Sequence, residues 1–199
     1  IGRQASGWIP RRRSGQSGLV STPAWRRENH WSGWIPADQL PSSYDPAEGF
    51  VLSANENVNQ PDGPIINTLF LPDYRYRRIR ERLTELSRAT IDDFKALQYD
   101  VVSLQARDLL KIFLPHLPTG EIKTRLENWS CHYSPESHEA SLFQRLYRNV
   151  ILEIFGQPSN GQGGIGWRRM FYLASRIGYS TMVITAIDAL LHKTSSTWW

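Results

Sequence analysis

Two asparagines after a short apolar stretch are the side chains in this sequence best suited to take part in a reaction. Asn55 and Asn57 lie in the run Ala54-Asn55-Glu56-Asn57, which follows the apolar residues 50–52. An asparagine at a strand end can point its amide N–H groups into a cleft, where fixed donors stabilise the negative charge that develops on a reacting oxygen. Asparagines also support ordinary turns, and the residue types alone leave that alternative open.

Other features that could bind a ligand or a metal lack the context that their chemistry requires. The glycine-rich run 161–166 has the spacing of a dinucleotide-binding turn, but it follows a predicted helix and not a strand, so we expect a flexible connector. No two histidines are spaced i, i+4 on one predicted helix, so no zinc site is predicted. Cys131 is the single cysteine, and we expect it to be a small buried residue.

The composition is that of a folded protein with a modest positive charge. Of the 199 residues, 40% are apolar and 12% aromatic, which excludes a disordered chain. Arginine clusters at 11–13, 26–27 and 75–82, interleaved with tryptophan, could form a groove for single-stranded nucleic acid. Because 19 acidic residues nearly offset 23 basic ones, solvated faces and ion pairs are the favoured interpretation.

The apolar pattern predicts no contact with a membrane. No apolar run reaches the roughly 18 residues that a spanning helix needs. The longest candidate, residues 179–191, is interrupted by Asp188. A membrane is therefore not expected as a partner.

The elements that must position the asparagines differ between residues 1–72 and residues 73–199. In the first part, Gly, Pro, Ser and Asn separate short apolar stretches such as 7–10 and 49–52, which is typical of strands joined by long loops. The second part has apolar residues at helical spacing and is mainly helical. Because neither part looks closed by itself, the sequence predicts one incomplete α+β domain over residues 1–199.

Two helices are predicted in the middle of the chain. The first begins at Tyr74 and has a largely charged surface. The second has Thr90 as its N-cap and extends to Pro115. The apolar residues that we expect to face inward along the second helix are Phe94, Leu97, Val101 and Leu104.

Further helices are predicted toward the end of the chain. One has Ser134 as N-cap and Pro135 at its first position, and it ends before Gly156. Two more helical segments are expected at 167–177 and 181–191, with a break at Gly178.

A series of short motifs extends, in a fixed order, over nearly the whole chain. The motifs are Gly7-Trp8-Ile9-Pro10-Arg11-Arg12, Trp31-Ser32-Gly33-Trp34-Ile35-Pro36, Leu40-Pro41, Asp45-Pro46, Gly49-Phe50, Ala54-Asn55-Glu56-Asn57, Tyr74-Arg75-Tyr76-Arg77-Arg78-Ile79, Leu97-Gln98-Tyr99-Asp100-Val101-Val102-Ser103, and Trp129 with Tyr133-Ser134-Pro135-Glu136-Ser137. In order and spacing they resemble the penicillin acylase (penicillin amidase) family. The chain is similar to an internal part of the family's larger (beta) chain.

This resemblance implies a fold and a reaction. Family members are N-terminal nucleophile hydrolases with a four-layer αββα fold, of which this chain would hold an incomplete part. Their precursor cleaves itself, and the new N-terminal Ser of the larger chain attacks a linear amide bond with its own amine as the base. Ile1 is not a nucleophile. The chain is therefore expected to be inactive alone and to need as partner the upstream remainder of the precursor, meaning the small chain and the nucleophile-bearing segment.

The resemblance also implies roles for particular residues. Asn57 matches the family's oxyanion-hole asparagine, and Arg75 matches an arginine that helps to orient this asparagine and the nucleophile's amine. Asn55 is the neighbour that a shifted register would exchange with Asn57. No cofactor is expected for the chemistry. Family members often hold a structural calcium ion, which the full-length protein could also contain, although no position here matches its ligands.

The substrate and the setting of the protein stay open at this level. The small-molecule amide could be a penicillin, an acyl-homoserine lactone or another linear amide. The alternative functions are a non-catalytic remnant or scaffold of the same fold, and a basic nucleic-acid-binding module. Both ends look cut, because the chain begins at Ile1 and ends on Trp198-Trp199. A periplasmic or extracellular location is implied by the resemblance alone.

Overall fold

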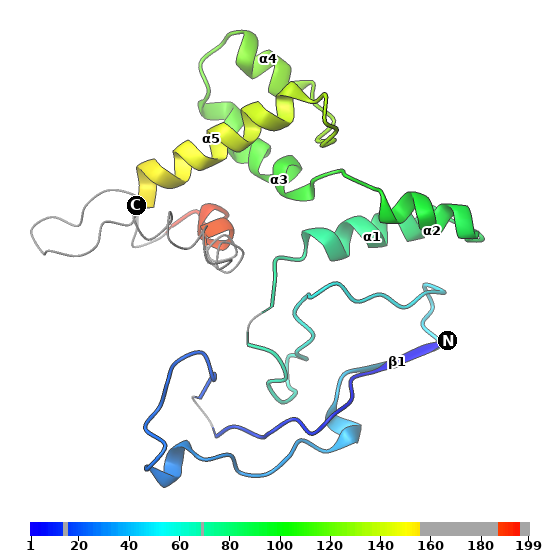
Figure 1. Cartoon of the computed structure of the whole chain (residues 1–199), viewed down its shortest axis with the longest axis vertical. Helices are drawn as coiled ribbons and strands as arrows, with labels where there is room; N and C mark the ends of the chain where they lie inside the picture. The colour runs from blue at the N-terminus through cyan, green and yellow to red at the C-terminus, as the bar shows by residue number, and fades with distance from the viewer. Residues whose placement is uncertain (14–15, 69, 156–186, 196–199) are drawn as a thin grey trace, which may run out of the picture. The chain divides into compact units, whose positions relative to one another are not determined.

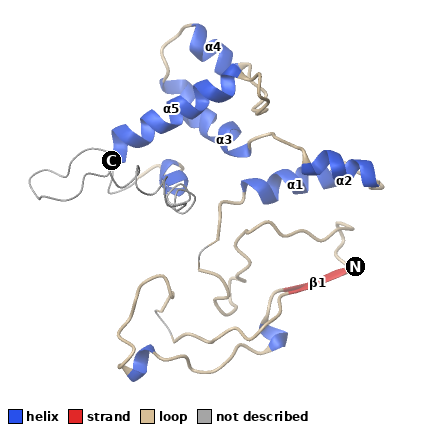
Figure 2. Ribbon diagram, in the orientation of Figure 1, coloured by secondary structure: helices blue, strands red, loops and turns tan. Residues whose placement is uncertain are grey.

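The computed structural model describes residues 1–13, 16–68, 70–155 and 187–195. The chain forms two compact units, Ile1–Ser87 and Arg88–Trp199. Figure 1 shows the course of the chain, and Figure 2 shows where its helices and strands lie. The boundary between the units follows the first helix and does not coincide with the change in composition near Tyr74.

The first unit contains few strands. β1 (Gly2–Gln4) pairs antiparallel with β2 (Ser42–Tyr44), with Arg3 opposite Ser43. Elsewhere among the described residues of this unit, strand pairing is limited to an isolated bridge between Pro10 and Trp34. The expected strand over residues 49–52 is wrong, because this stretch has no strand pairing and follows an extended loop. The mixed α+β prediction is thus right in its coarse form, with less strand than expected.

A short ladder closes the long loop between residues 12 and 31. Ile35 N donates to Ile9 O at 2.9 Å, and Arg11 N donates to Gly33 O at 2.8 Å. Trp8 and Trp34 meet edge to face at 5.5 Å between ring centroids. The loop is therefore closed by the pairing of residues 9–11 with residues 32–35. The 3-10 turn η1 (Arg27–Asn29) lies within the loop.

The helix predicted at Tyr74 is confirmed as α1 (Tyr74–Thr84). Its charged surface is occupied by ion pairs along the helix, including Arg77 with Asp73 at 3.2 Å and Arg82 with Glu85 at 2.7 Å. Arg80 reaches beyond the helix to Glu48, also at 3.2 Å. No residue of α1 is fully buried, and these pairs add modestly to the stability of the helix.

The single helix predicted from Thr90 to Pro115 is wrong, because the structure has two helices, α2 (Ile91–Gln98) and α3 (Leu104–Phe113). Thr90 does cap α2, in a capping box with Asp93. The break comes from Asp100, whose carboxylate accepts the N–H of Val102 at 3.0 Å, and from Ser103, whose hydroxyl caps α3.

The apolar stripe that we expected along this stretch is only partly buried. Leu104 on α3 is buried, whereas Phe94 on α2 is 49% exposed and Val101 is 40% exposed. Backbone pairing explains why Val101 cannot continue the helix, since Tyr133 N donates to Val101 O at 3.0 Å and Ser103 N donates to Cys131 O at 2.9 Å.

The last helix of the main described segment is α5 (His138–Phe155), and its predicted start was wrong. Ser134 and Pro135 precede the helix in a turn, and the hydroxyl of Ser137 accepts the N–H of Ala140 at 3.2 Å instead. The structure describes this helix as far as Phe155, and its predicted end before Gly156 lies at the edge of the described residues and stays a prediction. The sequence also missed α4 (Glu121–Glu127) and the 3-10 helix η3 (Leu114–His116), in which Pro115 lies.

The core of the second unit lies where α3, α4 and α5 meet (Figure 1). Phe143 on α5 is fully buried, and its ring stacks on Tyr147 with 6.0 Å between centroids. Arg125 on α4 donates two hydrogen bonds to Glu139 on α5, at 2.9 and 2.7 Å, which fixes these helices side by side. Cys131 is buried in this core, as predicted.

Residues 187–191 are helical and add to the same core. Ile187 packs into it, and Asp188 is buried with its carboxylate accepting from Tyr147 at 2.5 Å and from Gln105 at 2.7 Å. The predicted segment 167–177, the glycine run 161–166 and most of 181–191 lie outside the described residues. Among the helices that the structure describes, none has the length and hydropathy to cross a bilayer.

Candidate functional site

The segment from Ala54 to Asn57 forms a tight turn that is tied to the start of α1. Asn55 has φ of 66°, a left-handed conformation that asparagine adopts more readily than most residues. Its backbone oxygen accepts the N–H of Leu71 at 2.9 Å, and its side-chain oxygen accepts a hydrogen bond from the Arg75 guanidinium. Arg75 lies in the first turn of α1, so the helix holds Asn55 through a side-chain contact, while the backbone contact comes from Leu71 in the segment that precedes the helix.

Asn57 is held differently, by its own chain. Its side-chain oxygen Oδ1 accepts the N–H of Asn59 at 3.0 Å, which forms a turn that asparagine favours. Asn55 and Asn57 are both exposed. Each has its carbonyl oxygen engaged, and neither amide nitrogen Nδ2 donates to another residue in the part of the chain that the structure describes. Both side chains thus present free N–H donors to solvent.

Between the two asparagines, Glu56 is buried and locks the turn. The residue is 8% exposed, its Oε2 accepts the N–H of Ala54 at 2.6 Å, and its Oε1 accepts from Arg3 at 3.2 Å. Arg3 also donates to the backbone oxygen of Leu52. This arrangement connects β1 to the turn, and it was not predicted. The only sign of it in the sequence is an acidic residue in the middle of a turn that follows apolar residues. An acidic residue would be expected there equally if the position were exposed to solvent.

The electrostatics of Glu56 favour its charged form. Burial raises the pKa of its carboxyl, but hydrogen bonds from the backbone N–H groups of Ala54 and Glu56 and from Arg3 outweigh burial, so the pKa lies below its ordinary value of 4.5. A charged Glu56 retains these hydrogen bonds at neutral pH. These hydrogen bonds hold the turn between the two asparagines to Arg3 of β1.

Asn59 closes the loop that follows. Its side-chain oxygen accepts from the backbone N–H groups of Ile66 at 2.8 Å and Asn67 at 3.0 Å, while its Nδ2 donates to Asn67 O at 2.6 Å. The Asn59 side chain thus satisfies backbone groups of Ile66 and Asn67 that a neighbouring strand would otherwise bind. Because Asn59 N also binds Asn57, the closed loop helps to set the orientation of the Asn57 amide.

The structure thus brings Arg75 to Asn55, and it places Asn57 two residues further along the same turn. Chemically, the arrangement offers amide N–H donors whose carbonyl ends are fixed, which suits stabilisation of a developing oxyanion. In the part of the chain that the structure describes, no three or more His, Cys, Asp or Glu side chains lie together as metal ligands.

Comparison with known proteins assigns the chain to a family. The family described as Penicillin amidase matches residues 1–199, and the chain belongs to it. Among curated proteins, the penicillin acylase 2 proenzyme of Pseudomonas sp. (strain SE83) is 32% identical over 139 residues, which cover 67% of this chain and 18% of that protein. The acyl-homoserine lactone acylase QuiP of Pseudomonas putida is 28% identical and is matched along 100% of this chain and 26% of its own length.

A solved structure supports the same assignment of the fold. The thermostable penicillin G acylase of Alcaligenes faecalis aligns with a TM-score of 0.56 and 15% identity, covering 83% of this chain and 35% of that one. The chain spans about a quarter, 26%, of the length of its QuiP relative from Pseudomonas putida.

Proposed function

We propose that this chain is part of an amidohydrolase that cleaves a linear amide bond in a small molecule, and that it supplies an oxyanion donor from the turn 54–57. Membership of the Penicillin amidase family supports the reaction class. The nucleophile, an N-terminal Ser released by cleavage of the precursor, belongs to another segment of the protein. In this proposal the segment completes a four-layer αββα fold with that remainder and is inactive without it.

The contact between Arg75 and Asn55 is the observation that carries this proposal. The oxyanion donor in this proposal is Asn57, which matches the family's asparagine; its Oδ1 accepts from Asn59 N and the residue is exposed. Arg75 acts through Asn55, which it holds in the left-handed conformation that begins the turn. A fixed cation here also disfavours protonation of a nearby amine, and this would keep the amine of the nucleophile available as a base.

The names of two relatives suggest the class of substrate for this chain. One relative is named a penicillin acylase and another an acyl-homoserine lactone acylase, so the substrate is an N-acyl compound of one of these kinds. We also propose a periplasmic or extracellular location. The chemistry of amide hydrolysis by an N-terminal Ser needs no cofactor.

Two matched variants of the full-length protein test the assignment of the donor. Asn57→Ala should lower kcat by about 10² to 10³, because loss of one oxyanion donor costs this much, and should leave KM and the melting temperature nearly unchanged. Asn55→Ala should lower the melting temperature and reduce kcat less, since Asn55 positions the turn. Hydrolysis is measured as release of the free amine from a panel of N-acyl substrates.

The outcomes separate the alternatives clearly. A larger loss of kcat in Asn55→Ala than in Asn57→Ala would assign the donor to Asn55. Unchanged turnover in both variants would remove the turn from the catalytic site. Absence of amide hydrolysis by the full-length, correctly processed protein would instead favour a non-catalytic scaffold of the same fold.

A further inference from the structure

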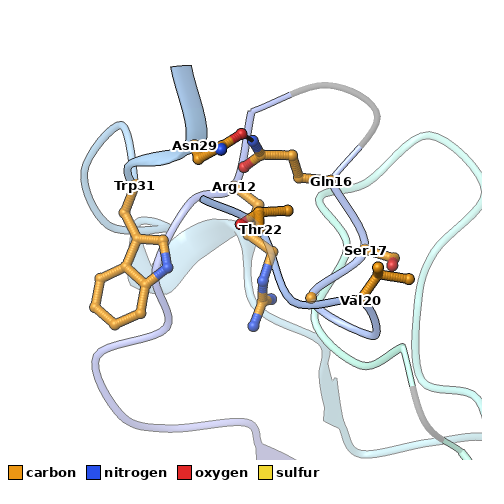
Figure 3. A pocket seen from close by; sticks show the side chains of 8 residues that line it. Arg12, Gln16, Ser17, Val20, Thr22, Asn29 and Trp31 are labelled. Carbon is orange, nitrogen blue, oxygen red and sulfur yellow. Dashed lines mark hydrogen bonds between the residues drawn. The ribbon is translucent and has the colours of Figure 1, made fainter. Parts of the chain in front are cut away.

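A cavity inside the loop that the 9–11 and 32–35 ladder closes is unrelated to the turn at Asn55 and Asn57. Its volume is about 200 Å³, and its lining residues include Arg12, Gly18, Thr22 and Trp31. Figure 3 shows the Arg12 and Thr22 side chains between Trp31 on one side and Ser17 and Val20 on the other. The cavity is smaller than the roughly 300–1,000 Å³ of sites for drug-sized ligands, so it suits a small molecule or one group of a larger one.

Hydrogen bonds between the two sides of the loop form the wall of this cavity, and the side-chain amides of Gln16 and Asn29 take part in them. Gln16 Nε2 donates to Asn29 Oδ1 at 2.8 Å and to Glu28 O at 3.0 Å, and Asn29 Nδ2 donates to Pro23 O at 2.8 Å. The hydroxyl oxygen of Ser17 accepts the N–H of Leu19 at 3.1 Å. These bonds tie the two sides of the loop together, so the cavity is a feature of an organised loop.

Arg12 is held in the cavity by packing. A Cβ atom added to Gly18 would lie 2.7 Å from Arg12 Nε and 3.0 Å from its Cζ, which shows that the guanidinium lies directly over the Gly18 backbone. Gly18 also has φ of 76°, which glycine adopts without strain. Arg12 makes no side-chain hydrogen bond or ion pair with any residue in the described ranges, whereas its neighbour Arg11 binds Gln39 Oε1 at 2.9 Å. Among the described residues, nothing therefore occupies the donors of Arg12, which lie against Gly18.

The positive charge around the cavity favours an anionic ligand. None of the residues that line the cavity is acidic. Residues 1–37 contain six arginines and a single acidic residue, Glu28. A guanidinium left unpaired in such a segment attracts an anionic group, and its planar fork matches the two oxygens of a carboxylate. One guanidinium balances one negative charge, as a carboxylate carries.

We propose that this cavity binds a small molecule through its carboxylate, with Arg12 as the anchor and the Trp31 ring as an apolar wall. Trp31 is 61% exposed and packs against Trp34 at 6.0 Å between centroids, so it forms a supported edge at the open side of the cavity. Thr22 also lines the cavity, and its hydroxyl is a further hydrogen-bond donor for the carboxylate. The site does not depend on the proposed amide hydrolysis, and failure of either proposal leaves the other standing.

Isothermal titration calorimetry on the full-length protein tests this site, with benzoate as the probe and benzamide as its uncharged analogue. The wild-type protein should bind benzoate and should bind benzamide at least about tenfold more weakly, because a charge-assisted hydrogen bond is lost. Arg12→Gln should weaken benzoate binding by about tenfold or more. Arg13→Gln is the matched control, because Arg13 is exposed, adjacent in sequence and absent from the cavity wall, and it should bind benzoate like the wild type.

A second variant guards against a folding defect in Arg12→Gln. Arg12→Lys keeps the charge but loses the fork, so it should bind benzoate with intermediate affinity while retaining the wild-type melting temperature. Equal binding of benzoate and benzamide, unchanged benzoate binding in Arg12→Gln, or an equal loss in Arg13→Gln would each overturn the proposal. Displacement of benzoate by equimolar inorganic phosphate would show an unspecific anion site and would overturn the carboxylate assignment.

Discussion

The guanidinium of Arg75, at the first turn of α1, donates a hydrogen bond to the side-chain oxygen of Asn55, twenty residues earlier in the chain. This contact joins the turn 54–57 to the helix that follows it. It fixes the residue that begins the turn in a left-handed conformation, with φ of 66°. Because both residues are exposed, the contact contributes geometry more than stability.

The first prediction concerns the coupling of these two residues. Arg75→Met and Asn55→Ala should each lower kcat of the full-length protein, and the double variant should be less impaired than the sum of the two, with a coupling on the order of 0.5–3 kcal/mol in transition-state stabilisation. Arg80→Met is the control on the same helix, since Arg80 contacts Glu48 and not the turn. Strict additivity of the two effects would show that the contact has no role in turnover.

The second prediction is a dependence of stability on pH that arises from Glu56. Its pKa in the folded protein lies below the ordinary 4.5, because hydrogen bonds from Ala54 N, Glu56 N and Arg3 outweigh the burial that would raise it. The stabilisation is therefore fully present above that ordinary value and is lost as the pH falls through the lower, folded value. Urea unfolding measured from about pH 7 to about pH 3 should show this loss, and Glu56→Gln should remove that part of the pH dependence.

The matched control for Glu56 is Asp62. Its side chain is exposed in the same unit, and Asp62→Asn should leave the shape of the pH profile unchanged. If Glu56→Gln retained the complete acid dependence of the wild-type protein, the Arg3–Glu56 pair at 3.2 Å would not be a determinant of stability.

The third prediction concerns the reactivity of Cys131. The thiol is buried, and burial raises its pKa, an effect that Arg107 opposes and Asp108 reinforces. Because the thiolate is the reactive form, iodoacetamide should modify Cys131 slowly in the folded protein and rapidly in denaturant, as followed by mass spectrometry of the Cys131 peptide. Fast modification under native conditions, with no loss of helical circular dichroism, would contradict the buried position.

The fourth prediction tests the core of the second unit. Phe143 is 0% exposed and contacts Trp129 at 5.9 Å and Tyr147 at 6.0 Å between ring centroids. Phe143→Ala should lower the free energy of unfolding by about 3–5 kcal/mol, because it leaves a cavity among these rings. Arg145→Ala, on the exposed side of α5, should change it by less than about 0.5 kcal/mol.

The sequence predicted correctly those features that depend on residues close together in the chain. The helix at Tyr74 and the Thr90 cap were predicted correctly, because capping and helical spacing act within a few residues. The ordered motifs likewise predicted the Penicillin amidase family, which matches residues 1–199. The catalytic roles of Asn57 and Arg75 remain predictions.

Local signals failed where residues distant in sequence compete for the same backbone. Val102 forms a bridge with His132, and this pairing ends the helical pattern that its apolar spacing favours. In the turn at Asn55, the residue types suggested loop asparagines, but nothing in them indicated that Glu56 would be buried against Arg3 from β1.

The sequence alone therefore determined the family, the helical character of residues after Tyr74 and the residue types available for chemistry, because these follow from periodicity, caps and ordered motifs. Only the tertiary structure decided that Arg75 reaches Asn55, that Glu56 and Arg3 form a pair within the first unit, and that Arg12 lies over Gly18 in a cavity with no ion-pair partner among the described residues. Each of these depends on chain segments brought together from far apart in the sequence, and the free energy of such contacts leaves no periodic pattern along the chain.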